Sequence, residues 1–416
     1  MSTPATVVDT GLDDEIGLDL TDPATFVGQG LDEFWQRLRA EQPVARHKAT
    51  VSAPAFWVLS RHDDVMAVMK DAERFVSRHG NMLTSLLSGG DPAGGRLLAV
   101  MDAPRHTALR TTLLKSFSPR VLRSVVEKVQ ARAEERMAAA VAKGDCDFAV
   151  EVSDHVPMGT ICDLLGVPDG DQAELLRLSK QALSSDEAGQ SAEDAWLARN
   201  EILLYFAELA AHRRSSPQDD LITTLTTVEV DGAPLSEEEL VLNCYGLVLA
   251  GDETSRLAAT GSVWNLLRHP DQWAAMKEGR VELATAVEEI LRWTSPALHV
   301  GRTAATDVRI GGRTIKAGET VTAWNVSANR DESVFADPCR FDLARTPNRH
   351  LTFGFGAHFC LGSYLGRAEL TAVLDTLLRR VDSIESLGAP KPVYSTFLQG
   401  YSSLPVRLHA AEDGER

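Results

Sequence analysis

The segment 351–362, LTFGFGAHFCLG, constrains the fold more strongly than any other part of the chain. It holds three glycines, three phenylalanines and one cysteine, Cys360, which stands directly before a helical pattern. The start of a helix carries partial positive charge and free N–H groups, and both favour a thiolate. Gly354 and Gly356 permit backbone conformations and close approaches that side chains would block. The segment therefore predicts a loop that presents one thiolate to a flat, apolar group.

A cysteine also has an ordinary alternative, because it is among the most buried residue types and usually only packs. We expect this alternative for the other four, which are Cys146, Cys162, Cys244 and Cys339. An odd number of widely spaced cysteines argues against a disulfide framework, and against a zinc or iron–sulfur site made of protein ligands alone. A metal that brings most of its own ligands fits Cys360 better. Haem is such a group, since its porphyrin supplies four nitrogens and the protein one axial sulfur.

The composition excludes several classes of protein. Of the 416 residues, 44% are hydrophobic, which is ample for a large core. The formal net charge of −17 argues against binding to nucleic acid and against a polybasic membrane anchor. The N-terminus has no signal-peptide pattern, and no run approaches the ~18 apolar residues that a membrane span needs. We therefore expect a soluble, cytoplasmic protein.

Hydrophobic periodicity predicts a mainly α-helical chain with small β-sheets. We expect a single domain over residues 1–416, with a flexible N-terminus at 1–20. The expected helices are 32–39, 61–70, several between 104 and 225, 237–269 with an interruption at 250–251, 271–293 and 361–382. The expected strands are 55–60 and a hairpin at 308–321, where residues alternate around a Gly-Gly turn. The expected loops and turns are 80–95, which is a candidate mobile loop, 184–191, 232–236 and 328–351.

Residues 353–362, FGFGAHFCLG, resemble the haem-binding signature of the cytochrome P450 superfamily, FGxGxHxCxG, at every fixed position. The resemblance implies haem b (iron protoporphyrin IX) with Cys360 as the axial ligand of the iron, and it places His358 near a haem propionate. The implied fold is the triangular, mainly helical one of that family. In it the haem lies between a central long helix and the helix after the cysteine loop. The other loop residues implied to surround the haem are Phe353, Gly354 and Gly362.

Residues 289–292, EILR, are similar to the ExxR element of the same family. By itself this is a weak signal, because Glu and Arg three residues apart also form ordinary helix-surface pairs. The family's third member is present as Arg345, in the turn-rich stretch. The resemblance implies that Glu289, Arg292 and Arg345 form a buried structural network that holds the cysteine loop.

Residues 250–255, AGDETS, resemble the motif of the family's central helix. Gly251 would weaken the helix and make room for dioxygen beside the haem, next to Ala250. Thr254 can donate a hydrogen bond to the oxygen, and Glu253 can relay protons from solvent. The alternative is a glycine-kinked helix with solvated acids. Family members that use peroxide directly usually lack this acid–alcohol pair, so its presence favours activation of dioxygen.

Haem propionates are anions and need cationic or hydrogen-bonding partners. His106 and Arg110 lie one helical turn apart, and Arg302 precedes the hairpin; all three match family positions. Together with His358 they give four groups for two carboxylates. Surface solvation is the alternative for each of them.

The resemblance implies a monooxygenase that inserts one oxygen atom from O2 into a substrate and releases the other as water. The 416 residues leave no room for a fused reductase, so we expect a separate ferredoxin and an NAD(P)H-dependent ferredoxin reductase. We also expect a monomer. The hypothesis for the ferredoxin is a basic docking patch on an acidic protein. Its members are Arg105, Lys115, Arg120 and Arg367.

The substrate is the least constrained part of the prediction. The sequence resembles actinobacterial enzymes that hydroxylate or epoxidise macrolides, other polyketides, terpenoids or peptides. Three alternatives stay open: an aminoacyl or acyl substrate tethered to a carrier protein, a peroxide-driven enzyme, and a non-catalytic haem-thiolate module. The expected pocket segments are 80–98, 182–196, 247–254, 296–301 and 397–401, the first two forming a mobile lid. The pocket residues singled out are Leu247, Ala250, Gly251, Leu298 and His299, of which His299 either contacts substrate or is an ordinary wall residue.

Overall fold

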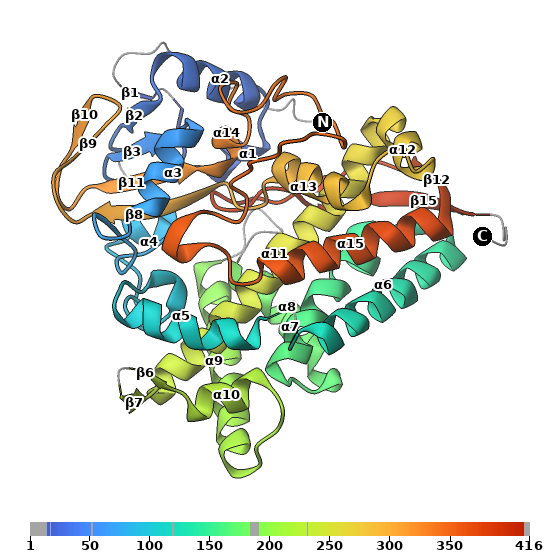
Figure 1. Ribbon diagram of the computed structural model, residues 1–416, viewed down its shortest axis with the longest axis horizontal. Coiled ribbons are helices and arrows are strands. Elements are labelled where there is room, and N and C mark those ends of the chain that lie inside the picture. The colour runs from blue at the N-terminus through green and yellow to red at the C-terminus, as the bar shows by residue number, and fades with distance from the viewer. Residues whose placement is uncertain are drawn as a thin grey trace.

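The computed structural model describes residues 15–16, 18–50, 53–118, 120–183, 191–230 and 232–411. The predicted mainly helical architecture with small sheets is confirmed (Figure 1). The α-helices are α1 (Pro23–Val27), α2 (Leu31–Glu41), α3 (His62–Lys70), α4 (Leu83–Leu87), α5 (Arg105–Ser116), α6 (Arg123–Lys143), α7 (His155–Leu165), α8 (Gln172–Leu183), α9 (Ala192–Ser215), α10 (Leu221–Thr227), α11 (Glu237–Arg268), α12 (Pro270–Lys277), α13 (Leu283–Thr294), α14 (Asn325–Ala328) and α15 (Ser363–Arg380). Shorter helical turns are η1 (Leu98–Val100), η2 (Ala149–Ser153), η3 (Asp169–Asp171) and η4 (Gly356–His358).

The main sheet has six strands in the order β1-β2-β3-β11-β8-β4 and lies at the upper left of Figure 1. Its strands are β1 (Glu15–Ile16), β2 (Val44–His47), β3 (Phe56–Leu59), β4 (Phe75–Val76), β8 (His299–Ala304) and β11 (Thr320–Trp324). At its centre β3 and β11 run parallel, with Trp57 paired to Val321. The smaller sheets are made of β5 (Asp145–Asp147), β12 (Val381–Ser386) and β15 (Pro405–Ala410); β6 (Glu229–Val230) and β7 (Ala233–Pro234); β9 (Val308–Ile310) and β10 (Arg313–Ile315); and β13 (Lys391–Pro392) and β14 (Tyr401–Ser403).

Helix α11 is 32 residues long and passes through the middle of the molecule (Figure 1). It begins with a capping box, in which Ser236 and Glu239 satisfy each other's backbone N–H groups. The predicted interruption at 250–251 is wrong, because the helix is continuous there. Gly251 instead allows close packing, since a Cβ atom at this position would lie 3.3 Å from Ile161 of α7.

The predicted helix 271–293 is two helices, α12 and α13. Gly279 has a φ of +67° and directly follows Glu278, the C-cap of α12, so the chain turns there instead of continuing. The hairpin prediction is confirmed: Gly311 and Gly312 have φ values of +52° and +79°, which a tight two-residue hairpin turn requires.

Three other predicted segments are described wholly or in part. The expected loop 80–95 contains the short helix α4, whose Leu83 and Leu86 are buried. Of the expected flexible N-terminus, residues 1–14 and 17 lie outside the described part of the chain, whereas β1 pairs with β2. Of the expected loop 184–191, residues 184–190 also lie outside it, and Ser191 caps the start of α9.

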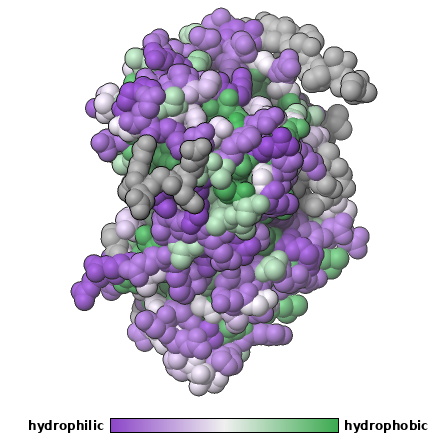
Figure 2. Space-filling view, turned by 90° about the vertical axis from the view of Figure 1, so that its right-hand side faces the viewer, coloured by the Kyte–Doolittle hydropathy of each residue, from purple (hydrophilic) through white to green (hydrophobic). Residues whose placement is uncertain are grey.

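The largest hydrophobic core joins α5, α6, α7, α9, α11, α13 and α15, and a second one lies between α3 and the main sheet. Helix α15 packs along α6 and also against α11, so the segment just before α15 is held against the central helix. Figure 2 shows the side that lies at the right of Figure 1: hydrophilic residues cover most of it, and hydrophobic residues gather near mid-height.

Candidate functional site

The loop before α15 has the glycine-dependent shape that its sequence predicts. Gly354 and Gly356 have φ values of +69° and +73°, a region that other residues rarely adopt. A Cβ atom on Gly356 would lie 2.5 Å from the carbonyl oxygen of Met69, so only glycine lets this loop pass α3. The backbone N–H of Cys360 donates to the carbonyl of Phe353 at 2.8 Å and closes the loop.

The Cys360 thiol lies at the entrance to α15, facing a cavity. Burial raises its pKa, while a backbone hydrogen bond at Gly362 and the charges of Arg110 and Arg367 act in the opposite direction. The helix start alone therefore does not ionise this thiol. A metal cation bound to the sulfur would do so, because a coordinating thiol loses its proton.

The cavity lies between α11 and the cysteine loop, where the resemblance placed the haem. One wall comes from the loop and the other from α11, with α5, β8 and the segment before α5 closing the sides. Its lining residues are Met69, Asn81, Leu97, Leu98, Ala99, His106, Arg110, Leu113, Asn243, Gly246, Leu247, Ala250, Val300, Arg302, Gly354, Phe355, His358, Cys360 and Leu361.

Four cationic or hydrogen-bonding groups converge on one end of this cavity. The rings of His106 and His358 lie 4.1 Å apart, and Ser77 hydroxyl is 3.1 Å from His358 Nε2. Burial together with the charges of Arg302 and Arg110 lowers the pKa of His358 to about 2. Burial, and then the charge of Arg110, lower the pKa of His106 to about 4.

These groups fit the two propionates of a haem. Arg302 is buried, which lowers the pKa of its guanidinium to about 10, and it donates a hydrogen bond of 2.7 Å to the carbonyl of Gly301. His106 Nε2 is buried and has no hydrogen-bond partner among the described residues. Carboxylates placed here would satisfy these donors and offset their mutual repulsion.

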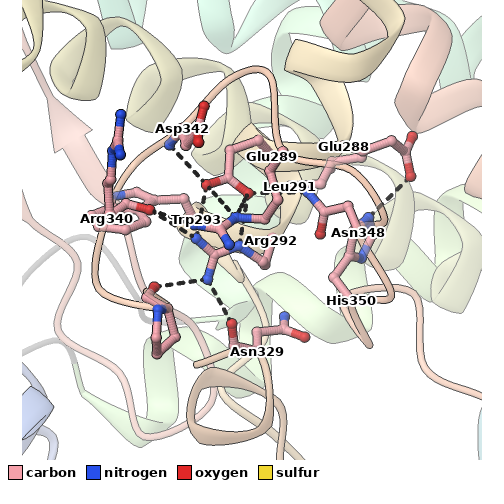
Figure 3. A network of polar contacts seen from close by, with 12 residues as sticks. Glu288, Glu289, Leu291, Arg292, Trp293, Asn329, Arg340, Asp342, Asn348 and His350 are labelled. Atoms are coloured by element: carbon pink, nitrogen blue, oxygen red, sulfur yellow. Dashed lines mark hydrogen bonds and ion pairs between the residues drawn. The ribbon is translucent and has the colours of Figure 1, made fainter. Parts of the chain in front are cut away.

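The predicted ExxR network is assembled in the structure, as Figure 3 shows. Glu289 and Arg292, both fully buried, are joined by two hydrogen bonds of 2.7 and 2.8 Å. Arg345 approaches the same carboxylate at 3.1 Å. Arg292 Nη1 donates to the carbonyl of Asn329 at 2.7 Å, and the Asn329 side chain accepts from the N–H of Leu351 at 2.7 Å. The network therefore reaches the first residue of the cysteine segment.

A second ion pair supports the same loop and was not predicted. Arg367 of α15 donates to Glu288 at 2.6 Å, and its guanidinium lies 4.5 Å from the ring centre of Phe353. Burial opposes ionisation of Glu288, but the hydrogen bonds from Arg367 and His350 outweigh it and lower the pKa of Glu288 to about 2. The sequence signal was the acid next to Glu289 together with an arginine one turn into α15.

The acid–alcohol pair lies on α11, one turn beyond Ala250. Thr254 Oγ1 donates to the carbonyl of Ala250 at 3.1 Å. Glu253 is buried, and its Oε2 accepts a hydrogen bond of 2.6 Å from Arg256. Glu253 therefore cannot take up a proton directly from solvent, as the prediction required, because its carboxylate does not reach the surface.

The predicted substrate-pocket residues divide into two groups. Leu247 and Ala250 line the cavity. Gly251 faces α7, and Leu298 and His299 belong to the packing around Trp324, so these three are not part of the lining. His299 fits neither predicted alternative, because it lies behind the cavity wall: burial lowers its pKa to about 3, and its Nε2 accepts from the backbone N–H of Leu83 at 3.1 Å.

Sequence reasoning missed Asn243 and Gly246, which precede Leu247 and Ala250 on the same face of α11. Their helical spacing was the available signal. Asn243 accepts from the N–H of Leu98 at 2.9 Å and so fastens one side of the cavity to α11. Leu97 packs so closely on Gly246 that a Cβ atom there would lie 2.4 Å from its side chain.

Two of the four arginine and lysine residues predicted for ferredoxin docking have charged partners. Arg105 pairs with Glu239 of α11, and Arg367 pairs with Glu288. Lys115 and Arg120 are exposed.

The comparisons with known proteins agree with this site. The family model described as "Cytochrome P450" matches residues 173–407, more than half of the chain. The chain belongs to the cytochrome P450 superfamily. It is 47% identical over 408 residues to "Cytochrome P450 NovI" of Streptomyces niveus, covering 98% of this chain and all of that protein. It is 34% identical over 409 residues to "Steroid C26-monooxygenase" of Rhodococcus jostii (strain RHA1), covering 96% of this chain and 86% of that protein.

Solved structures of P450 enzymes have the same fold. P450 OxyD, which is involved in the biosynthesis of vancomycin-type antibiotics, superposes with a TM-score of 0.87 at 35% identity, covering 95% of this chain and all of OxyD. CYP108D1 from Novosphingobium aromaticivorans gives a TM-score of 0.84 at 36% identity, covering 94% of this chain and 97% of that one. The predicted triangular P450 fold is therefore confirmed.

The P450 is a monooxygenase, and its cofactor is haem with a cysteine thiolate as axial ligand. Cys360 is the one cysteine of the five that lines the cavity. When bound, haem supplies the activation of dioxygen and the transfer of one oxygen atom to substrate, which the thiolate favours. Within the described residues, no helix combines the length and the apolar character that a membrane crossing requires.

Proposed function

We propose that this P450 hydroxylates or epoxidises a small-molecule intermediate of secondary metabolism, such as a macrolide, another polyketide, a terpenoid or a peptide. The observation that carries the proposal is the cavity that joins Cys360 on one side to Leu247 and Ala250 of α11 on the other. The likeness to OxyD and its role in antibiotic biosynthesis supports the substrate class.

The geometry supports the following residue roles. Cys360 binds the iron, and the four groups around His358 bind the propionates. Thr254 and Glu253 pass protons toward the reacting oxygen, because Thr254 can exchange its hydrogen bond to Ala250 for one to the oxygen. The ExxR network holds the loop, since losing one partner of a buried ion pair strands the other charge. Phe353, Gly354 and Gly362 complete the loop around the haem.

We propose that electrons come from a separate ferredoxin and its NAD(P)H-dependent reductase, and that the P450 works as a monomer in the cytoplasm. The exposed Lys115 and Arg120, with Arg123 at the start of α6, form the docking patch. Arg120 and Arg123 line one surface hollow beside Tyr364 of α15, four residues after Cys360. Reversal of all three charges should lower ferredoxin-supported reduction about tenfold at low salt, and unchanged reduction would exclude the patch. Arg309→Glu on the β9–β10 hairpin is the control.

An optical titration tests the reaction class and the substrate class. The reduced protein should give the red-shifted carbon monoxide spectrum of a thiolate-bound haem, and Cys360→Ala should abolish it. A natural-product library is then titrated into the ferric protein. A compound that shifts the haem to high spin and is converted to a product one oxygen atom heavier supports the proposal.

Other outcomes separate the alternatives. A normal carbon monoxide spectrum without a shift from any free compound, but with a shift from a loaded carrier protein, identifies a carrier-tethered aminoacyl or acyl substrate. Failure to consume NAD(P)H with every redox partner and ligand identifies a non-catalytic haem-thiolate module.

A further inference from the structure

A cluster of buried charges lies where α11 meets α7 and α8. Asp252, Glu253 and Arg256 of α11 are all at most 1% exposed. Asp154, directly before α7, is 2% exposed and forms an ion pair with Lys180 of α8. Lys180 retains about a fifth of its side-chain surface and is the most exposed of these five residues.

Counting charges in this cluster gives Asp252 a proton. Lys180 is matched by Asp154, and Arg256 is matched by Glu253 at 2.6 Å. Among the described residues, an ionised Asp252 would add a third anion to two cations in a buried site, and an unmatched buried charge is strongly unfavourable. Burial and the neighbouring Glu253 accordingly raise the pKa of Asp252 well above its ordinary value.

Glu253 is the carboxylate that can accept the proton of Asp252. Both oxygens of Asp252, and Oε1 of Glu253, are buried and have no hydrogen-bond partner among the described residues. The other groups that face Asp252 are Arg256, Asp154 and Lys180, together with Cys162 of α7. Cys162 is a neutral thiol, because burial and then Asp252 raise its pKa to about 12. Glu253 is thus the adjacent carboxylate with an unused acceptor oxygen.

A carboxylate paired with an arginine has no proton to give, so Glu253 alone does not explain a proton relay to Thr254. We propose that Asp252 and Glu253 share one proton, and that Asp252 is the store from which Glu253 is protonated. This inference rests on the proposed role of Glu253 and Thr254. Asp252 does not itself contact the reacting atoms. It acts through Glu253, to which it supplies the proton.

The transfer balances within the cluster. The O–H bond of Asp252 breaks, and an O–H bond forms on Glu253. Neutral Glu253 then loses its ion pair with Arg256, so its side chain is released toward Thr254. The Asp252 carboxylate that remains is stabilised by Arg256 and Lys180 until water delivers a new proton at the exposed end of Lys180.

Infrared spectroscopy of the ferric holoenzyme without substrate tests where the proton is. The difference spectrum between wild type and Asp252→Asn at neutral pH should show a carbonyl band of a buried protonated carboxyl that shifts in D2O. Any band from Glu369, whose pKa burial raises to about 7, is common to both proteins and cancels. In Glu253→Gln this band should remain, but as the pH rises it should disappear at a lower pH than in wild type, because the neighbouring negative charge is gone and the pKa of Asp252 falls. Asp307→Asn, at an exposed ionised carboxylate, is the control that removes no such band. A difference spectrum that lacks the band refutes the store.

Electron-donor oxidation with a surrogate ferredoxin and reductase tests the relay, using the spin-shifting compound of the titration or dioxygen alone. Asp252→Asn and Glu253→Gln should each slow oxidation by at least about tenfold, raise the solvent deuterium isotope effect, and give no further loss when combined. Asp252→Leu replaces the Asn variant if that variant does not retain haem. If both Asp252 variants oxidise the electron donor at the wild-type rate while Glu253→Gln is slow, Asp252 is not the proton store and the proposed function stands. Wild-type rates in all variants refute the proposed role of Glu253 as well.

Discussion

Glu369 is a buried acid whose replacement gives a measurable dependence of stability on pH. It lies on α15, is 5% exposed, and its carboxyl interacts with the hydroxyls of Ser255 on α11 and Thr160 on α7. Burial raises its pKa from 4.5 to about 7, although both hydroxyls and the charge of Arg132 act in the opposite direction. Glu369→Gln keeps the shape and the hydrogen bonds and removes the titration.

The raised pKa fixes the sign of the effect. Below pH 4.5 the carboxyl is protonated in both the folded and the unfolded chain, so it contributes no difference. As the pH rises from 4.5 to about 7, the unfolded chain releases this proton first, and the folded protein loses stability. A shift of this size corresponds to about 3 kcal/mol, so Glu369→Gln should be more stable than wild type by about that amount above pH 7 and equal to it below pH 4.5.

Urea-induced unfolding of the two proteins at a series of pH values measures this difference. Effects of all other titrating groups cancel, because only Glu369 differs. Glu385→Gln, which makes the same exchange at an exposed acid of β12, is the control for the substitution itself. A constant difference between Glu369→Gln and wild type from pH 4 to pH 9 would show that Glu369 titrates normally and would refute the reasoning.

Three further predictions concern the haem loop. Arg292→Ala removes the buried arginine of the two that neutralise the Glu289 carboxylate and should reduce the free energy of unfolding by about 3–5 kcal/mol, measured by urea titration; a loss below about 1 kcal/mol would contradict a structural role. Gly356→Ala should cost about 1–3 kcal/mol and lower haem content, because its Cβ would meet the carbonyl of Met69; Gly170→Ala in η3, whose Cβ would meet nothing within 4 Å, is the control and should retain haem. Arg302→Leu should speed loss of haem to an excess of a competing haem-binding protein by about tenfold or more, and an unchanged rate would remove Arg302 from the propionate site.

The sequence predicted those parts of the site that short motifs encode. The cysteine loop needs glycine at fixed positions and a helix directly after Cys360, and both are local features. Arg345 was located because the family pattern supplies a long-range contact that periodicity alone does not show; it meets Glu289 across 56 residues. The contact between these two residues was therefore predicted from the family resemblance and not from the local sequence.

The failures have physical causes outside the range of local patterns. Arg105 was assigned to the surface, but it pairs with Glu239, which lies 134 residues away. Gly251 suggested a break in α11, yet the packing of Ile161 against it outweighs its low helix propensity. His299 follows an apolar run like a pocket residue, but the sheet turns its ring toward Trp324.

The centre of the main sheet has a consequence for how the P450 is made. Strand β3 pairs with β11, which is synthesised long after it, and the haem site likewise joins α5 to the loop at Cys360. At about 5–20 residues per second, β3 leaves the ribosome roughly 10 to 50 s before its neighbour exists. Until then one strand edge stays open to other chains. The yield of active P450 in a recombinant host should therefore depend on translation speed and on chaperones that cover the N-terminal third, because the haem site too is incomplete until the last quarter of the chain has appeared.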